Sequence, residues 1–207
     1  MPARWTTVCA SPAEGDLAEG GPAQGGPAQG GPAKRDLGAA THIIPGMTAR
    51  KPEITVAAIT ESDGRFLVVE ERINRRLVFN QPAGHVEHGE SLLNAVVREV
   101  REETAWRFLP ASLVGVYLWR SPESGVTTMR FAFCGTVDDH QAAQPLDHGI
   151  VRTHWLSRAD LQEREQLLRS PLVLRCIEDY EGGKRHPLDS VAHLDLLTAS
   201  AMPAVAV

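Results

Sequence analysis

The stretch from Gly84 to Thr104, "GHVEHGESLLNAVVREVREET", decides how the rest of the sequence is interpreted. Its second half carries apolar residues at intervals of three and four positions, namely Leu93, Val96, Val97 and Val100. On an α-helix this spacing places the four side chains in one stripe, which must pack against a core. The stretch therefore predicts an amphipathic helix that is anchored to a sheet or to other helices.

The glutamates of this stretch follow a second pattern. Three of the five, Glu99, Glu102 and Glu103, repeat at helical spacing on a face roughly 100° round from the apolar stripe. Like charges this close repel one another, and Arg98 and Arg101 offset only part of the repulsion. Carboxylates that converge from one rigid element suit Mg²⁺ or Mn²⁺. The alternative interpretation is a solvated helix face on which the arginines pair with the glutamates.

The residues before the helix complete a longer pattern. A Gly is followed by five residues, a Glu, seven residues, Arg-Glu, an aliphatic residue, any residue and Glu-Glu. The matching positions are Gly84, Glu90, Arg98, Glu99, Val100, Glu102 and Glu103. This pattern resembles the signature of the Nudix hydrolases. The resemblance extends over about residues 51 to 190, through "FLVVEE", "NQPAGH", a Trp-containing strand followed by "RFAF", "RSPLV" and "GGKRHPL".

One position departs from the family pattern, which closes with Gly and an aliphatic residue. This chain has Ala105 and Trp106 there. The family Gly caps the helix in the left-handed conformation, which costs a non-Gly residue roughly 1 kcal/mol or more. We therefore expect a slightly strained or differently shaped helix exit that leaves the ligand set untouched.

The resemblance implies a fold and an activity. The fold would be of the α+β class, a Nudix-type α/β/α sandwich with a mixed β-sheet. The activity would be Mg²⁺-dependent cleavage of a phosphoanhydride bond, with Mn²⁺ as the other candidate cofactor. Similarity to phosphatases of this family implies release of orthophosphate from nucleoside tri- and diphosphates. It also implies action on the hydroxymethylpyrimidine pyrophosphate of thiamine biosynthesis.

Two alternatives to that activity stay open. One is a housekeeping enzyme of the same family that releases pyrophosphate instead of orthophosphate. The other is a non-hydrolytic ligand sensor that has kept the fold. Such sensors usually lose glutamates from the signature, whereas this chain keeps all of them.

The resemblance also implies roles for individual residues. Glu99, Glu102 and Glu103 would be metal ligands, and the Gly84 carbonyl would add a main-chain oxygen. Glu99 would also position the attacking water or serve as the base. Arg98 would orient a glutamate rather than bind phosphate, the alternative being an exposed helix arginine.

The loop before the helix offers further candidates. Glu90 lies near the helix start, where the macrodipole stabilises a carboxylate, and is expected either to support the site or to cap the helix. Glu87 is a second supporting candidate without a defined role. His85 and His88 form an HxxH spacing, but no second ligand pair accompanies it, so a structural or substrate contact is favoured over zinc binding.

Three further positions bear on the base and on substrate binding. Many Nudix enzymes carry an acidic residue six positions before a Trp of a late strand, and here that position is Gly149, with Asp147 and His148 nearby. Trp119 and Arg130 fall on neighbouring predicted strands, where an aromatic face could stack on a ring and a guanidinium could hold phosphate. Core packing or a surface salt bridge is the alternative for both.

The remaining pattern agrees with a mixed sheet. Strands are predicted at 54–60, 65–71, 77–79, 112–120, 127–137 and 150–156, with a hairpin turn at Asp63-Gly64 and another turn at 122–125. Helices are predicted to open at Ser157 and with Pro171 in the first turn. Because strands and helices are interleaved without regular βαβ alternation, helices should pack on a mixed sheet.

Composition limits the partners and the compartment. A net charge of −5 argues against duplex nucleic acid as a partner, because phosphate contacts need a basic face, whereas a small substrate could bind through a cation. Three cysteines without ligand spacing favour a reducing compartment, and Cys134 and Cys176 are expected in the core. The expectation is a cytoplasmic enzyme that binds no membrane and is a monomer or homodimer.

The two ends of the chain differ from its middle. Residues 1 to 50 contain two copies of GGPAQ and one of GGPAK, and are expected to be disordered because they lack large apolar side chains. Translation is hypothesised to begin at Met47, just before the first strand-like run. The Nudix domain is predicted over 51–190, and 191–207 form a C-terminal tail.

Overall fold

The computed structural model describes residues 51–194, so the expectations for residues 1 to 50, for a start at Met47 and for most of the tail lie outside it. The described chain contains eight strands: β1 (Glu53–Ile59), β2 (Glu61–Ser62), β3 (Arg65–Ile73), β4 (Arg76–Asn80), β5 (Ala83–His85), β6 (Arg107–Arg120), β7 (Thr127–Asp138) and β8 (Ile150–Ser157). Its helices are α1 (Leu92–Thr104), α2 (Arg158–Glu163) and α3 (Leu172–Glu181), with short 3₁₀ turns η1 (Glu165–Leu167) and η2 (Leu188–Ser190).

The strands form two sheets, and the larger one is mixed. Its order is β5-β1-β7-β6, in which β1 pairs parallel to β7 and antiparallel to β5. The second sheet is antiparallel, with the order β2-β3-β4 and with β8 paired to β3. The predicted mixed sheet with helices packed on it is therefore confirmed.

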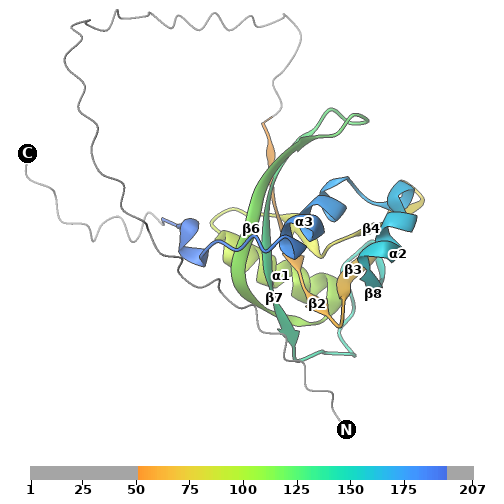
Figure 1. Cartoon of the computed structure of the whole chain (residues 1–207), viewed down its shortest axis with the longest axis horizontal. Helices are drawn as coiled ribbons and strands as arrows, with labels where there is room; N and C mark the ends of the chain where they lie inside the picture. The colour runs from red at the N-terminus through yellow and green to blue at the C-terminus, as the bar shows by residue number, and fades with distance from the viewer. Residues whose placement is uncertain (1–50, 195–207) are drawn as a thin grey trace, which may run out of the picture. The chain divides into compact units, whose positions relative to one another are not determined.

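Two apolar clusters lie on opposite faces of the larger sheet. Alternate residues of β1 and β7 pack against α1 on one face, where Ala95, Val96 and Val100 are fully buried. The intervening residues pack against α2 and α3, which contribute Leu161, Cys176 and Ile177 to the second cluster. Figure 1 shows α1 and α3 on the two sides of the β6–β7 hairpin. This is the helix, sheet, helix layering expected of the α/β/α sandwich.

The first hairpin differs from its prediction. Asp63 and Gly64 form the expected two-residue turn, with φ angles of 50° and 71°, between Ser62 and Arg65. The strand that this turn joins to β3 is the two-residue β2, whereas the long preceding strand β1 pairs with β5 and β7. The turn prediction is correct, but the expectation that the run at 54–60 forms the first arm of the hairpin is wrong. The turn chemistry fixes only its nearest neighbours.

The helix ends agree with the sequence signals. Ser157 caps α2 through a reciprocal capping box with Asp160, and Pro171 stands directly before α3. Ala105 ends α1 in the left-handed conformation at φ 58°, so the strain expected at this position is present. Its N–H donates to the Arg101 carbonyl, and the helix therefore closes as it would with a glycine.

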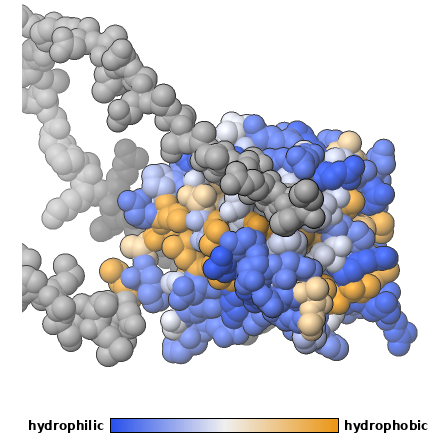
Figure 2. Space-filling view, turned by 90° about the horizontal axis from the view of Figure 1, so that it is seen from below, coloured by the Kyte–Doolittle hydropathy of each residue, from blue (hydrophilic) through white to orange (hydrophobic). Residues whose placement is uncertain are grey.

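Two remaining expectations concern the core and the surface. Cys134 and Cys176 are buried free thiols, as predicted. The face of the described domain in Figure 2 is largely hydrophilic, with apolar side chains gathered in separate areas. Within residues 51–194, none of the helices combines the length and the apolar character needed to cross a bilayer.

Candidate active site

The site begins where the edge strand β5 meets α1. Strand β5 pairs with β1, so that Gly84 lies opposite Val56, and α1 packs its apolar stripe on the same sheet. The carboxylate face of α1 is thereby directed at the backbone of β5. The Ala83 N–H donates to Glu103 Oε2 over 2.9 Å, which fixes that carboxylate against the strand. Helix and strand together position the glutamates that the signature predicts.

Gly84 is required by the close approach of a second glutamate. A Cβ atom built on Gly84 would collide with the carboxylate of Glu99. The glycine of the signature therefore serves to admit the Glu99 side chain. Sequence reasoning assigned to Gly84 a carbonyl ligand and did not foresee this steric role.

Arg98 lies at the centre of a network of carboxylates. Its Nε and Nη2 donate to the two oxygens of Glu90 over 2.9 and 3.0 Å. Its Nη1 donates to Glu99 Oε1 over 2.8 Å and to Glu102 Oε2 over 3.0 Å, and Nη2 also reaches the His85 carbonyl. The geometry places Arg98 among three glutamates, and a forked guanidinium of this kind can hold carboxylates in a fixed orientation.

Glu90 precedes the helix and does not cap it, because the N-cap is Ser91, whose Oγ accepts the Asn94 N–H. Glu90 instead accepts the guanidinium of Arg98 in bidentate fashion. Arg98 is the main cause that lowers the pKa of Glu90. Glu90 thus holds Arg98 in place. Glu87 lies exposed in the loop and contacts Glu90 through its backbone, donating its N–H to the carboxylate and accepting the Glu90 N–H with its carbonyl.

The three helix glutamates differ in burial. Glu99 and Glu103 are 8% and 7% exposed, whereas the Glu102 side chain is 45% exposed. Burial raises the pKa of Glu103 to about 9, opposed by the hydrogen bond from Ala83 and reinforced by nearby carboxylates that include Glu99. Burial also raises the pKa of Glu99, and the hydrogen bond from Arg98 opposes that shift. Buried carboxylates that resist ionisation in this way are stabilised by a cation.

Asp147 joins this cluster from a distant part of the chain. Its N–H donates to the Glu102 carbonyl over 2.8 Å, and its charge raises the pKa of both Glu99 and Glu103. In the sequence, Asp147 is a candidate only because it lies close to Gly149, the position at which many Nudix enzymes carry an acidic residue. The hydrogen bond from Asp147 to α1 brings this carboxylate near the helix glutamates, although Asp147 does not stand six positions before Trp155.

Glu99 and Glu103 lie against the backbone of Gly84 and Ala83, and Arg98 joins Glu99 to Glu102. Carboxylate oxygens are the kind of ligand that Mg²⁺ and Mn²⁺ prefer. Within residues 51–194, no group of three Asp, Glu, His or Cys side chains is arranged so that it could hold a metal ion. One reason is that Arg98 hydrogen-bonds to Glu99 and Glu102, so these two carboxylates are turned toward the guanidinium.

The loop histidines do not join the glutamates. The His85 ring lies 3.2 Å from a carboxylate oxygen of Glu53, and only the His85 backbone touches the signature through Arg98. His88 is exposed. A structural or substrate contact for these two histidines therefore stays a prediction.

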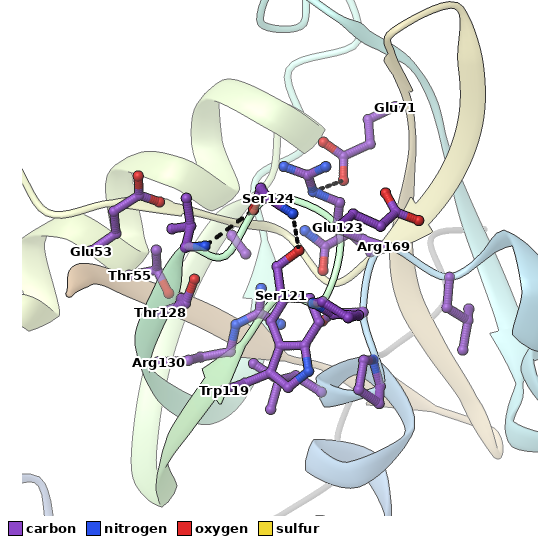
Figure 3. Close-up of a pocket in the computed structure, with 18 of the residues that line it drawn as sticks. Glu53, Thr55, Glu71, Trp119, Ser121, Glu123, Ser124, Thr128, Arg130 and Arg169 are labelled. Atoms are coloured by element: carbon purple, nitrogen blue, oxygen red, sulfur yellow. Dashed lines mark hydrogen bonds and ion pairs between the residues drawn. The ribbon is translucent and has the colours of Figure 1, made fainter. Parts of the chain in front are cut away.

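A cavity of about 840 Å³ extends from the β5 end of the site across the larger sheet. Ala83, Gly84 and His85 line one end, while Trp119 and Arg130 line the part over β6 and β7 (Figure 3). The two strands pair antiparallel, with Trp119 opposite Thr128, so the predicted neighbourhood of Trp119 and Arg130 is present. Arg130 is only 6% exposed and donates to Gln81 Oε1 over 3.2 Å.

A family model described as the NUDIX domain matches residues 49–175, which is more than half of the chain. Together with the sandwich fold and the signature residues from Gly84 to Glu103, this match shows that the chain belongs to the Nudix family. It is an enzyme of that family, a hydrolase that acts on phosphoanhydride bonds. Nudix hydrolases generally use divalent metals, and the carboxylates of α1 are ligands of the kind that such metals prefer.

Individual relatives narrow the comparison. The chain is 38% identical over 141 residues to "Phosphatase NudJ" of Escherichia coli strain K12, and the match covers 68% of this chain and 91% of that protein. A solved NUDIX hydrolase from Nitrosomonas europaea is 46% identical with a TM-score of 0.69, covering 70% of this chain and 99% of that one. A MutT protein from Methanosarcina mazei Go1 is 25% identical with a TM-score of 0.52, covering 65% and 98%.

Proposed function

We propose that this chain is a Mg²⁺-dependent phosphatase that releases orthophosphate stepwise from nucleoside tri- and diphosphates, with Mn²⁺ as a substitute ion. We further propose that it acts on the hydroxymethylpyrimidine pyrophosphate of thiamine biosynthesis. The identity to a phosphatase over most of the domain supports the orthophosphate product. The carrying observation is the pair of buried carboxylates, Glu99 and Glu103, which lie against Gly84 and Ala83, two residues that line a cavity large enough for a nucleotide.

The residues of the site divide the work. A bound divalent cation would neutralise the diphosphate and make a water molecule more acidic. Glu99, Glu102 and Glu103 would hold that cation with the Gly84 carbonyl. Glu99, fixed by Arg98, would also orient the attacking water in line with the scissile bond. Arg98 is itself held by Glu90, so it acts as a positioning residue for the carboxylates.

Two other activities compete with this proposal. A housekeeping Nudix enzyme would release pyrophosphate from the same nucleotides, and the described residues offer no contact that selects the scissile bond. A ligand sensor would bind without cleaving. Retention of all three helix glutamates and of Arg98 favours the enzyme over the sensor.

One incubation distinguishes the three. The full chain is incubated with Mg²⁺ and either ATP or ADP, and the phosphorus products are identified by ³¹P NMR. Orthophosphate from both nucleotides supports the proposal. Pyrophosphate from ATP would identify the housekeeping enzyme, and intact nucleotide with measurable binding would identify the sensor.

Variants then test the assigned ligands. Glu102→Gln should lower turnover by orders of magnitude with the fold intact, because this side chain is half exposed. Glu163→Gln on α2 is the matched control, since its side chain is 78% exposed and lies outside the site. Full activity in Glu102→Gln would remove this residue from the ligand set.

We also propose a cytoplasmic location and a monomeric or homodimeric state. The buried free thiols Cys134 and Cys176 support a reducing compartment. Light scattering of the full chain measures the mass, and a trimer or larger assembly would contradict the second proposal.

A further inference from the structure

Unpartnered polar atoms are concentrated in one place. Seven buried side-chain nitrogen or oxygen atoms in residues 51–194 make no hydrogen bond. Five of them line the cavity described above: Thr55 Oγ1, Glu71 Oε1, Asn80 Oδ1, Arg130 Nε and Ser170 Oγ. Buried polar groups in native proteins are nearly always satisfied, because an unmade hydrogen bond there costs free energy. A cluster of exceptions in one cavity indicates that a ligand satisfies them.

The strand register places two of these atoms side by side. Thr55 on β1 is the direct partner of Arg130 on β7, so their side chains leave the sheet on the same face. Thr128, two residues before Arg130 on β7, lies on the same face, and its direct partner on the neighbouring strand β6 is Trp119. Figure 3 shows Trp119, Thr128, Arg130 and Thr55 along one side of the cavity. The indole forms a flat apolar wall beside a buried donor.

The acceptors come from the other sheet. Asn80 pairs with Val69, and Glu71 lies two positions further along β3 on the same face. The Asn80 side chain hydrogen-bonds to Glu71, which opposes the rise that burial causes in the pKa of Glu71. Arg169 lies 3.9 Å from Glu71 Oε1, an ion pair too long to be a hydrogen bond (Figure 3). The cavity thus offers two adjacent acceptors, Asn80 Oδ1 and Glu71 Oε1.

These acceptors argue against an anion at this end of the cavity. A phosphate or carboxylate would accept hydrogen bonds from Arg130 and the hydroxyls. It has no N–H group to donate to Asn80 Oδ1 and Glu71 Oε1, so these two oxygens would stay without a hydrogen bond. A neutral ring that carries an amino group fits better. Its two N–H groups match the two acceptors, a neighbouring ring nitrogen matches the Arg130 Nε–H, and its face matches Trp119.

We infer that this part of the cavity selects an amino-substituted nitrogen heterocycle, an aminopyrimidine or aminopurine, over its keto counterpart. Asn80, Glu71 and Arg130 read the amino edge, and Trp119 stacks on the ring. This inference rests on the proposed function, since it names the organic part of a substrate whose phosphates lie at the Gly84 end. It also gives Arg130 a role in base recognition in place of phosphate binding.

Matched nucleotide pairs test the selection. ATP and ITP differ in an amino or keto group at one ring position, as do CTP and UTP. We expect kcat/KM to be about tenfold or more higher for the amino member of each pair, because the keto oxygen would face buried acceptors. Equal values within both pairs, or a preference for the keto members, would overturn the inference.

Binding separates this test from catalysis. The affinities of AMP and IMP, and of CMP and UMP, are measured by titration calorimetry on the full chain in EDTA, where no turnover is needed. The amino member should bind about tenfold more tightly. If nucleotides are bound with this preference but not cleaved, the proposed function fails and the inference stands. Cleavage with no amino preference would overturn the inference alone.

Two threonines provide a matched pair of variants. Thr55 and Thr60 are both buried and both carry an unpartnered hydroxyl, but only Thr55 lines the cavity. Thr55→Val and Thr60→Val preserve shape and remove one unsatisfied group each, so neither should lower the thermal midpoint. Thr55→Val should raise the KM for ATP about fivefold, and Thr60→Val should leave it unchanged. The same KM in both variants would show that the Thr55 hydroxyl contacts no substrate.

Asn80→Ala tests the acceptor directly. It should lower the ratio of ATP to ITP affinity toward one, through a loss that falls on ATP. If this variant is too unstable to purify, the nucleotide pairs on the unmodified chain still decide the question. An unchanged ratio in a folded Asn80→Ala protein would contradict the assigned role of Asn80.

Discussion

Replacing Glu103 by Gln should make the metal-free protein more stable at alkaline pH while abolishing its activity. Glu103 is 7% exposed, and burial raises its pKa to about 9, against a value of 4.5 for the unperturbed carboxyl. Between these two values the folded state keeps a proton that the unfolded chain has lost. The free energy of unfolding therefore falls as pH rises through this window, because the folded state binds more protons.

The size of this effect follows from the two pKa values. Each pH unit in the window costs about 1.4 kcal/mol, so the three units between about pH 4.5 and about pH 7.5 cost up to about 4 kcal/mol. A glutamine has the same shape and can still accept the Ala83 N–H, but it carries no titrating proton. The variant should therefore lack this part of the decline.

The assay is urea unfolding in EDTA at a series of pH values from about 5 to about 9, for the unmodified chain and for both glutamate variants. Glu102→Gln is the control, because it removes one carboxylate from the same helix at a side chain that is 45% exposed. Parallel curves for the unmodified chain and Glu103→Gln would refute the reasoning, since they would mean that Glu103 is already ionised in the folded protein. Adding Mg²⁺ should stabilise the unmodified chain more than Glu103→Gln, because the cation favours the ionised carboxylate.

Three further substitutions test single contacts. Gly84→Ala should lower kcat/KM at least tenfold with an unchanged circular dichroism spectrum, because the added methyl displaces the Glu99 carboxylate; a fully active variant would contradict the steric role. Arg98→Lys should also lower kcat/KM tenfold or more, since an ammonium cannot reproduce the bidentate contact with Glu90. If Arg98→Lys were as active as the unmodified chain, only the positive charge of Arg98 would matter. Ala105→Gly should raise the free energy of unfolding by about 1 kcal/mol, as measured in urea, and a decrease would show that the left-handed residue is unstrained.

The sequence predicted the elements whose signals are local. The stripe of α1, the turn at Asp63-Gly64 and the cap at Ser157 depend on residues close together in the chain, and each is present. The pairing of β1 was not predicted, because a parallel partner more than 70 positions away leaves no mark on local alternation. The hairpin turn suggested that β1 pairs with β3, the next long strand, whereas in the structure β1 pairs with the distant strand β7.

The site shows the same division. The spacing of the signature predicted that Glu99, Glu102 and Glu103 share a helix face, but not that two are buried and one is half exposed. That difference arises because β5 covers one side of the face, and strand placement is a tertiary property. The neighbourhood of Asp147 and of Asn80 could not be inferred for the same reason, since each reaches its cavity or cluster through contacts between distant segments.

The end of α1 explains how the chain tolerates an alanine where the family has glycine. The carbonyl of Ala105 accepts hydrogen bonds from the Gln141 N–H over 2.9 Å and from Arg101 Nη1 over 3.0 Å. Arg101 also binds the carbonyl and the carboxylate of Asp139. These contacts tie the strained helix exit to the segment that carries Asp147, whose N–H meets the last turn of the same helix. The left-handed conformation is thus held by bonds to Gln141 and Arg101, and Asp147 is held by a separate bond to the Glu102 carbonyl. Relief of strain at Ala105 therefore leaves the bond that holds Asp147 unchanged and need not improve catalysis.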